Sequence, residues 1–175
     1  KICGIQNKNT LLCCEKNNVN FFGMIFYPKS PRNISIKNAI ALQSISKDLN
    51  INGVGVFVNK NINELQEIIK DLKLQFVQLH GTEDEEYIKT VKKIGIKIIK
   101  SISINNKDDL NKIYKYKSND YFLFDYKPLK NELPGGNAKS FDWNILKYLE
   151  TDKPWFLSGG INTNNIEEII NDLNP

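Results

Sequence analysis

With 175 residues, of which 41% are hydrophobic and 25% charged, the chain has the size and composition of one soluble globular domain. No window approaches the roughly 18 consecutive apolar residues of a membrane span, and the first residues lack the basic, apolar and small-residue succession of a secretory leader. The 24 basic and 20 acidic residues are interspersed, without the charge blocks of nucleic-acid-binding arms, so we expect no nucleic-acid partner. Without a span or a leader, we expect a cytoplasmic protein with no membrane partner.

Short runs of β-branched and aromatic residues alternate along the chain with longer stretches in which apolar residues recur at helical spacing. The short runs predict strands at residues 2–5, 21–25, 54–58, 76–79, 96–101, 121–124 and 155–157. Helical spacing is clearest in residues 65–72 and 166–173, where apolar side chains return every three or four positions. The pattern predicts seven consecutive strand-then-helix units.

Three of the segments between strands carry polar pairs that can satisfy the free N–H groups at a helix start. The threonine–glutamate pair matches the capping-box motif, and the two other pairs, which start with asparagine, can act in a similar way. These pairs are Thr82 with Glu85, Asn61 with Glu64, and Asn106 with Asp109. We therefore expect helices to begin near residues 62, 83 and 107.

The three cysteines form an odd set, with nine residues between Cys3 and Cys13 and none between Cys13 and Cys14. This spacing fits neither a paired metal site nor a disulfide framework, so reduced thiols are the simplest interpretation. Cys13 and Cys14 fall in the first helical segment, where we expect them to pack without a chemical role.

Repeated strand-then-helix units imply parallel strands joined by right-handed crossovers. An open doubly wound sheet and a closed barrel both satisfy this pattern. Polar residues at the C-terminal ends of several strands favour the barrel, because a barrel assembles its active site from separate loops at that end. These residues are Cys3, His80, Asp125 and Ser158. The expected fold is an α/β structure, a (β/α)8 TIM barrel with about seven βα units in this chain.

Seven short motifs, in order along the chain, carry a resemblance to a known family. They are KICGI (residues 1–5), FYPKSPR (26–32), GVFVN (55–59), QLHG (78–81), LFD (123–125), PGG…FDW (134–143) and LSGGI (157–161). Together they resemble phosphoribosylanthranilate isomerase, an enzyme of tryptophan biosynthesis. The resemblance implies an Amadori rearrangement of N-(5-phosphoribosyl)anthranilate to 1-(2-carboxyphenylamino)-1-deoxyribulose 5-phosphate, with no cofactor and no metal.

The resemblance assigns the general base to Cys3 and the general acid to Asp125. Such a reaction needs an acid to protonate the furanose ring oxygen and a base to remove the C2′ proton, so two proton-transfer groups suffice. Arg32, the only arginine in the chain, resembles the residue that holds the anthranilate carboxylate, for which a guanidinium offers two parallel N–H donors. His80 is the only histidine; a substrate contact and a partly buried hydrogen-bonding role are equally compatible with its position.

Two glycine pairs, each expected to precede a helix, are the predicted phosphate-binding segments. The predicted contacts are Gly135, Gly136, Asn137, Ser158, Gly159 and Gly160. The family's loop usually reads GG-x-G before FDW, whereas this chain has alanine at position 138. If that position requires a positive φ, Ala138 is strained there.

Domain organisation and function each leave an alternative open. We expect residues 1–175 to form a single domain that lacks an eighth βα unit, which the parent gene would encode beyond Pro175. A catalytically silent phosphate-binding barrel is one rival function, and another sugar-phosphate isomerase or epimerase is the second. Metal-dependent epimerases need several histidine ligands, which disfavours them here. The sequence does not discriminate between a monomer and a homodimer.

Overall fold

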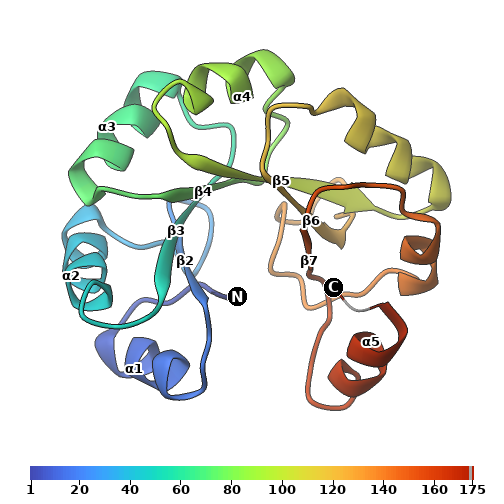
Figure 1. Cartoon of the computed structure of the whole chain (residues 1–175), viewed down its shortest axis with the longest axis horizontal. Helices are drawn as coiled ribbons and strands as arrows, with labels where there is room; N and C mark the ends of the chain where they lie inside the picture. The colour runs from blue at the N-terminus through green and yellow to red at the C-terminus, as the bar shows by residue number, and fades with distance from the viewer. Residues whose placement is uncertain (174) are drawn as a thin grey trace.

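A computed structural model describes residues 1–173 and 175 of the chain. Within these residues, seven parallel strands form one sheet in the order β1 to β7, so each strand pairs with its neighbours in sequence. The sheet curls, and helices cover its outer face (Figure 1). This confirms the predicted α/β barrel architecture with seven βα units. No helix in the described part of the chain is long and apolar enough to span a bilayer.

The elements follow the predicted order, although two of the helices are of the 3₁₀ type. The strands are β1 (Ile2–Cys3), β2 (Phe21–Ile25), β3 (Asn52–Phe57), β4 (Phe76–Leu79), β5 (Lys97–Ile104), β6 (Tyr121–Tyr126) and β7 (Trp155–Leu157). The α-helices are α1 (Lys8–Lys16), α2 (Ile36–Ser46), α3 (Ile62–Leu72), α4 (Glu85–Lys92) and α5 (Ile166–Leu173), and the 3₁₀ helices are η1 (Lys107–Lys115) and η2 (Trp143–Tyr148).

The alternation of side chains along each strand separates an inner core from the outer layers. The inner cluster contains Val54, Ile99 and Leu123, with ring packing between Phe21 and Phe76 at a centroid distance of 5.1 Å. Two larger clusters lie on the helical face, one over β2 to β5 and one over β5 to β7. The inner cluster thus fills the floor of the curled sheet and leaves the C-terminal strand ends for polar side chains.

The helix starts agree with the sequence expectations at two of three places. Asn106 and Asp109 form the reciprocal capping box of η1, and Asn61 caps α3. The Thr82 prediction is wrong, because Asp84 caps α4 by accepting the Tyr87 N–H. The Thr82 hydroxyl and N–H both bond to Asn59, so residue 82 belongs to the preceding loop.

Strands β5 and β6 extend further than expected. Their pairing continues through Ser103 with Asp125 and Ile104 with Tyr126. Asp125 therefore lies within β6 and not in the loop after it, which gives its backbone the rigidity of a paired strand. At the other end of the fold, α5 buries Ile169, while Ile166 and Ile170 on the same helix are exposed.

An ion pair is buried behind the ends of β3, β4 and β5. The Lys100 Nζ lies 2.9 Å from Glu83 Oε2, and each side chain is only 1% exposed. Lys100 also donates to the Gly81 carbonyl, while Glu83 accepts the backbone N–H groups of Asn59 and Gly81. Burial lowers the pKa of Lys100, although Glu83 acts in the opposite direction. The pair joins the loops after β3 and β4 to strand β5.

Candidate active site

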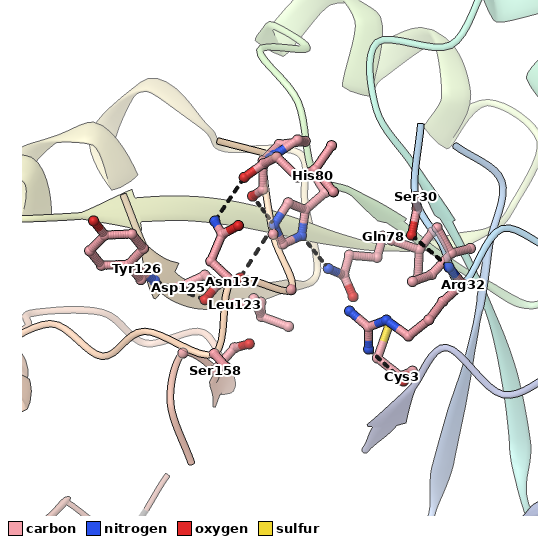
Figure 2. A pocket seen from close by; sticks show the side chains of 18 of the residues that line it. Cys3, Ser30, Arg32, Gln78, His80, Leu123, Asp125, Tyr126, Asn137 and Ser158 are labelled. Atoms are coloured by element: carbon pink, nitrogen blue, oxygen red, sulfur yellow. Dashed lines mark hydrogen bonds and ion pairs between the residues drawn. The ribbon is translucent and has the colours of Figure 1, made fainter. Parts of the chain in front are cut away.

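A cavity of about 610 Å³ opens at the C-terminal ends of the strands. Its volume lies in the range of roughly 300–1,000 Å³ typical of small-molecule sites. All ten site residues expected from the sequence line it, namely Cys3, Arg32, His80, Asp125, Gly135, Gly136, Asn137, Ser158, Gly159 and Gly160. Figure 2 shows the side chains of Cys3, Arg32, His80, Asp125, Asn137 and Ser158. The structure therefore gathers residues from β1, β6 and the loops after β2, β4, β6 and β7 around one space.

Cys3 ends β1 and is half-buried at the wall of the cavity. It pairs with Gly23 of β2, where an added Cβ atom would lie only 2.7 Å from the Cys3 sulfur. The glycine therefore provides the space that the thiol occupies. The two other cysteines lie on α1, where Cys14 is buried and burial raises the pKa of its thiol. The expectation that Cys13 also packs is wrong, because it is exposed on the outer side of α1.

Arg32 approaches Cys3 from the loop between β2 and α2. Its Nη1 donates to the Cys3 carbonyl oxygen at 3.1 Å, and its own backbone N–H bonds to the Ser30 hydroxyl. The guanidinium also lies against the loop after β6, since a Cβ atom on Gly136 would be 2.5 Å from Nη2. A single bond of the guanidinium is thus used to fix its position, which leaves further N–H donors for a ligand.

Asp125 faces the cavity from β6 and is 7% exposed. Its Oδ1 accepts the N–H of Tyr126 at 2.8 Å, and its Oδ2 lies 3.4 Å from His80 Nε2. Figure 2 shows Cys3 and Asp125 on opposite sides of the view, with Gln78 and His80 between them. Among residues 1–173 and 175, no hydrogen bond joins the thiol to the carboxylate.

His80 is the centre of a polar network that the sequence did not reveal. Its Nε2 lies 2.8 Å from the Pro134 carbonyl oxygen, and its Nδ1 lies 2.6 Å from Gln78 Nε2 and 2.9 Å from Ser101 Oγ. Gln78 and Ser101 received no role from the sequence. Gln78 stands two residues before His80, and side chains two apart on a strand share a face. This spacing could have predicted that Gln78 lies beside His80.

The glycine pairs do not stand at helix starts, contrary to expectation. η2 begins at Trp143 and α5 at Ile166, so both pairs lie in the loops that precede these helices. Gly135 and Gly136 are close-approach positions instead, because a Cβ atom on Gly135 would lie 2.8 Å from His80 Nε2. The Asn137 amide donates to the Leu133 carbonyl within the same loop. Ser158 bonds through its backbone N–H to the Phe124 carbonyl, beside the cavity.

Ala138 has a φ of 53°, in the left-handed region that an L-residue other than glycine occupies at a cost. Ala138→Gly should relieve this strain and raise the free energy of unfolding by about 0.5–1 kcal/mol, after the entropic cost of glycine is subtracted. Urea unfolding measures the change. The matched control is Ala41→Gly on the exposed face of α2, which should lower stability by a similar amount. A loss of stability in Ala138→Gly would show that the loop does not hold this conformation in solution.

Comparison with known proteins adds independent information. The family model described as N-(5′-phosphoribosyl)anthranilate isomerase matches residues 1–175. A protein of that name from Brucella canis is 38% identical over 173 residues, which cover 97% of this chain and 78% of the relative. The crystal structure of phosphoribosyl anthranilate isomerase from Thermus thermophilus is similar with a TM-score of 0.86 and 26% identity, covering 99% of this chain and 82% of that one.

A further solved structure contains a ligand. It is phosphoribosyl anthranilate isomerase in complex with reduced 1-(o-carboxyphenylamino)-1-deoxyribulose 5-phosphate. It is similar to this chain with a TM-score of 0.81 and 28% identity, over 99% of this chain and 81% of that one. These similarities run through the whole set of strands whose ends line the cavity.

Proposed function

Because the chain belongs to the N-(5′-phosphoribosyl)anthranilate isomerase family, we propose that Cys3, Asp125 and Arg32 carry the reaction of that family in the cavity at the strand ends. The chain is an aldose–ketose isomerase of tryptophan biosynthesis, and its ligand is a sugar phosphate. The observation that carries the residue assignment is the placement of one thiol and one carboxylate in a single cavity, without a bond between them.

Asp125 donates a proton to the furanose ring oxygen, so that the C1′–O bond breaks and the ring opens to a protonated Schiff base. Cys3, as thiolate, then removes the C2′ proton, and the electron pair of that C–H bond moves to form the enolamine. Tautomerisation of the enolamine gives the ketose product. The two groups act on different atoms of one ribose, which fits their separate positions on β1 and β6. A thiol is an effective base only as thiolate, which is the form in which Cys3 removes the proton.

The phosphate is assigned to the two loops that close the other part of the cavity. Gly135 and Gly136 belong to the loop after β6, and Gly159 and Gly160 to the loop after β7. Backbone N–H groups in such loops can receive an anion without a helix start, provided that successive N–H groups converge. Asn137 and Ser158 stand in the same loops and add polar side chains.

Arg32→Lys tests the assignment of the anthranilate carboxylate. A lysine ammonium is a point charge and cannot form the two parallel bonds of a guanidinium, so we expect KM to rise by the equivalent of about 1.5–3 kcal/mol. Steady-state kinetics with the anthranilate substrate measure the change. Lys29→Arg, an exchange of basic residues at an exposed position of the same loop, should leave KM unaltered. Unchanged kinetics in Arg32→Lys would remove Arg32 from the site.

The function itself is tested by incubating the full-length protein with N-(5-phosphoribosyl)anthranilate and following the substrate fluorescence. Conversion to the ketose form abolishes this fluorescence, and the loss should be proportional to protein concentration. The alternative of a catalytically silent barrel predicts saturable binding of the sugar phosphate without any loss of fluorescence. Binding without turnover would therefore refute the isomerase assignment.

A further inference from the structure

We propose that Gln78 and Ser101 are positioning residues that hold His80 as the neutral tautomer protonated on Nε2. In this form His80 docks the loop after β6 and leaves Asp125 able to donate a proton. The inference rests on the proposed role of Asp125 as general acid, although its first part, the tautomer, stands independently of that role. His80 is 10% exposed at its side chain and Gln78 is 2% exposed, so the network is shielded from water.

The proton on Nε2 follows from the chemistry of its partner. The Pro134 oxygen, 2.8 Å from Nε2, is a carbonyl and can only accept a hydrogen bond. Nε2 must therefore carry a hydrogen, because a lone pair at this distance would face the lone pairs of the carbonyl. In a neutral imidazole the other nitrogen, Nδ1, is then an acceptor and requires donors.

The donors on the Nδ1 side are the Gln78 amide and the Ser101 hydroxyl. Gln78 Nε2 lies 2.6 Å from Nδ1 and donates to Ser101 Oγ at 3.1 Å, and Ser101 Oγ lies 2.9 Å from Nδ1. This orientation leaves Gln78 Oε1 buried without a partner among the described residues. The amide nitrogen faces Nδ1 and donates to Ser101 Oγ, so Nδ1 accepts and the ring that carries a hydrogen on Nε2 is neutral.

The tautomer matters because one nitrogen faces both the loop and the catalytic carboxylate. His80 Nε2 contacts the Pro134 carbonyl, lies 3.4 Å from Asp125 Oδ2, and would be 2.8 Å from a Cβ atom on Gly135. A neutral ring keeps the loop docked beside Asp125. An imidazolium in the same place would favour the ionised carboxylate, which is the form that cannot donate a proton to the substrate.

The test uses the fact that His80 is the only histidine in the chain, so that its ring signals need no assignment. In the ¹⁵N-labelled protein, two-bond nitrogen–proton correlation at neutral pH should show a protonated Nε2 and an unprotonated Nδ1. Gln78→Glu places an anionic acceptor at Nδ1 while the Pro134 carbonyl still requires a hydrogen on Nε2, so both nitrogens should be protonated and the ring should become an imidazolium. We expect kcat to fall by at least about tenfold with KM nearly unchanged, which is the loss typical of one hydrogen bond to a charged group.

Three further variants make the test decisive. Gln75→Glu is the matched control, because Gln75 is exposed just before the start of the same strand, and it should preserve both spectrum and kcat. Ser101→Ala should lower kcat by about three- to tenfold, and Ser101→Thr, which keeps the hydroxyl, should restore it. The two Ser101 variants test the inference even if Gln78→Glu does not fold.

A wild-type ring protonated on Nδ1, or on both nitrogens, would overturn the inference. So would a folded Gln78→Glu variant with unchanged tautomer and kcat, or a Ser101→Ala variant with wild-type kcat. If the wild-type protein has the expected tautomer but no isomerase activity, the proposed function fails while the arrangement around His80 stands. The two proposals are therefore separable by experiment.

Discussion

Asp125→Asn is expected to lower kcat by at least about 100-fold and to leave KM nearly unchanged, because an amide retains the size of the carboxyl group but cannot donate its proton. Cys3→Ser should have a comparable effect, since a hydroxyl is not ionised at neutral pH and is a poor base. Both substitutions are nearly isosteric, so the folded state should persist. Steady-state kinetics by loss of substrate fluorescence, with circular dichroism to verify folding, measure the effects.

The chain supplies an internal control for the cysteine. Cys13→Ser makes the same chemical change at an exposed position on α1, and its kcat should equal that of the unsubstituted protein. Full activity in Cys3→Ser would exclude the thiol as base while leaving the fold intact. A rise in KM without a fall in kcat in Asp125→Asn would instead indicate a binding role for this carboxylate.

Lys100→Met should lower the free energy of unfolding by about 3–5 kcal/mol, because it removes the cation that compensates the buried Glu83 carboxylate. Methionine has a similar shape, so the loss reflects the uncompensated charge more than a cavity. The exposed Lys97 at the start of the same strand pairs with Asp120, and Lys97→Met should cost less than about 1 kcal/mol. Urea unfolding of both variants measures the difference.

The partner of Lys100 allows a stricter version of this experiment. Glu83→Gln alone leaves Lys100 without its counterion, whereas Lys100→Met combined with Glu83→Gln removes both charges. The double variant should therefore be destabilised by less than the sum of the two single variants. Strict additivity, or a loss below about 1 kcal/mol in Lys100→Met, would show that the two charges do not depend on each other.

The sequence predicted both the architecture and the residues that line the cavity, because both depend on where the parallel strands lie and end. The alternation of apolar runs and helical periods indicated seven parallel strands, and parallel strands bring their C-terminal residues, such as Cys3 and Asp125, to one edge. The expected eighth βα unit stays a prediction, as do the roles of the site residues.

What the sequence did not predict depends on contacts between loops. The capping role given to Thr82 failed because Asn59, 23 residues earlier, holds that residue. The helix starts expected at the glycine pairs failed because these glycines serve close approaches between segments. Gly135 and Gly136 lie where His80 and Arg32 approach, and Gly159 and Gly160 lie against residues 139 and 140 of the loop after β6. Lys100 was hidden in an apolar run, although its position two residues after Ile98 places both on the helical face. Such contacts join segments that are distant in sequence, so they cannot be predicted from the local periodicity of apolar residues.

The position of Arg32 allows the cavity to be labelled selectively with an arginine-directed reagent. The only guanidinium of the chain is half-buried at the cavity wall, beside the Cys3 carbonyl. An arginine-directed dicarbonyl reagent therefore has a single target, and one adduct per chain reports that target directly by mass. If Arg32 binds the ligand as proposed, a sugar phosphate in the cavity should shield the guanidinium, and protection from labelling then reports occupancy of the cavity. Ligands can then be ranked by their protection even in variants that no longer turn over substrate.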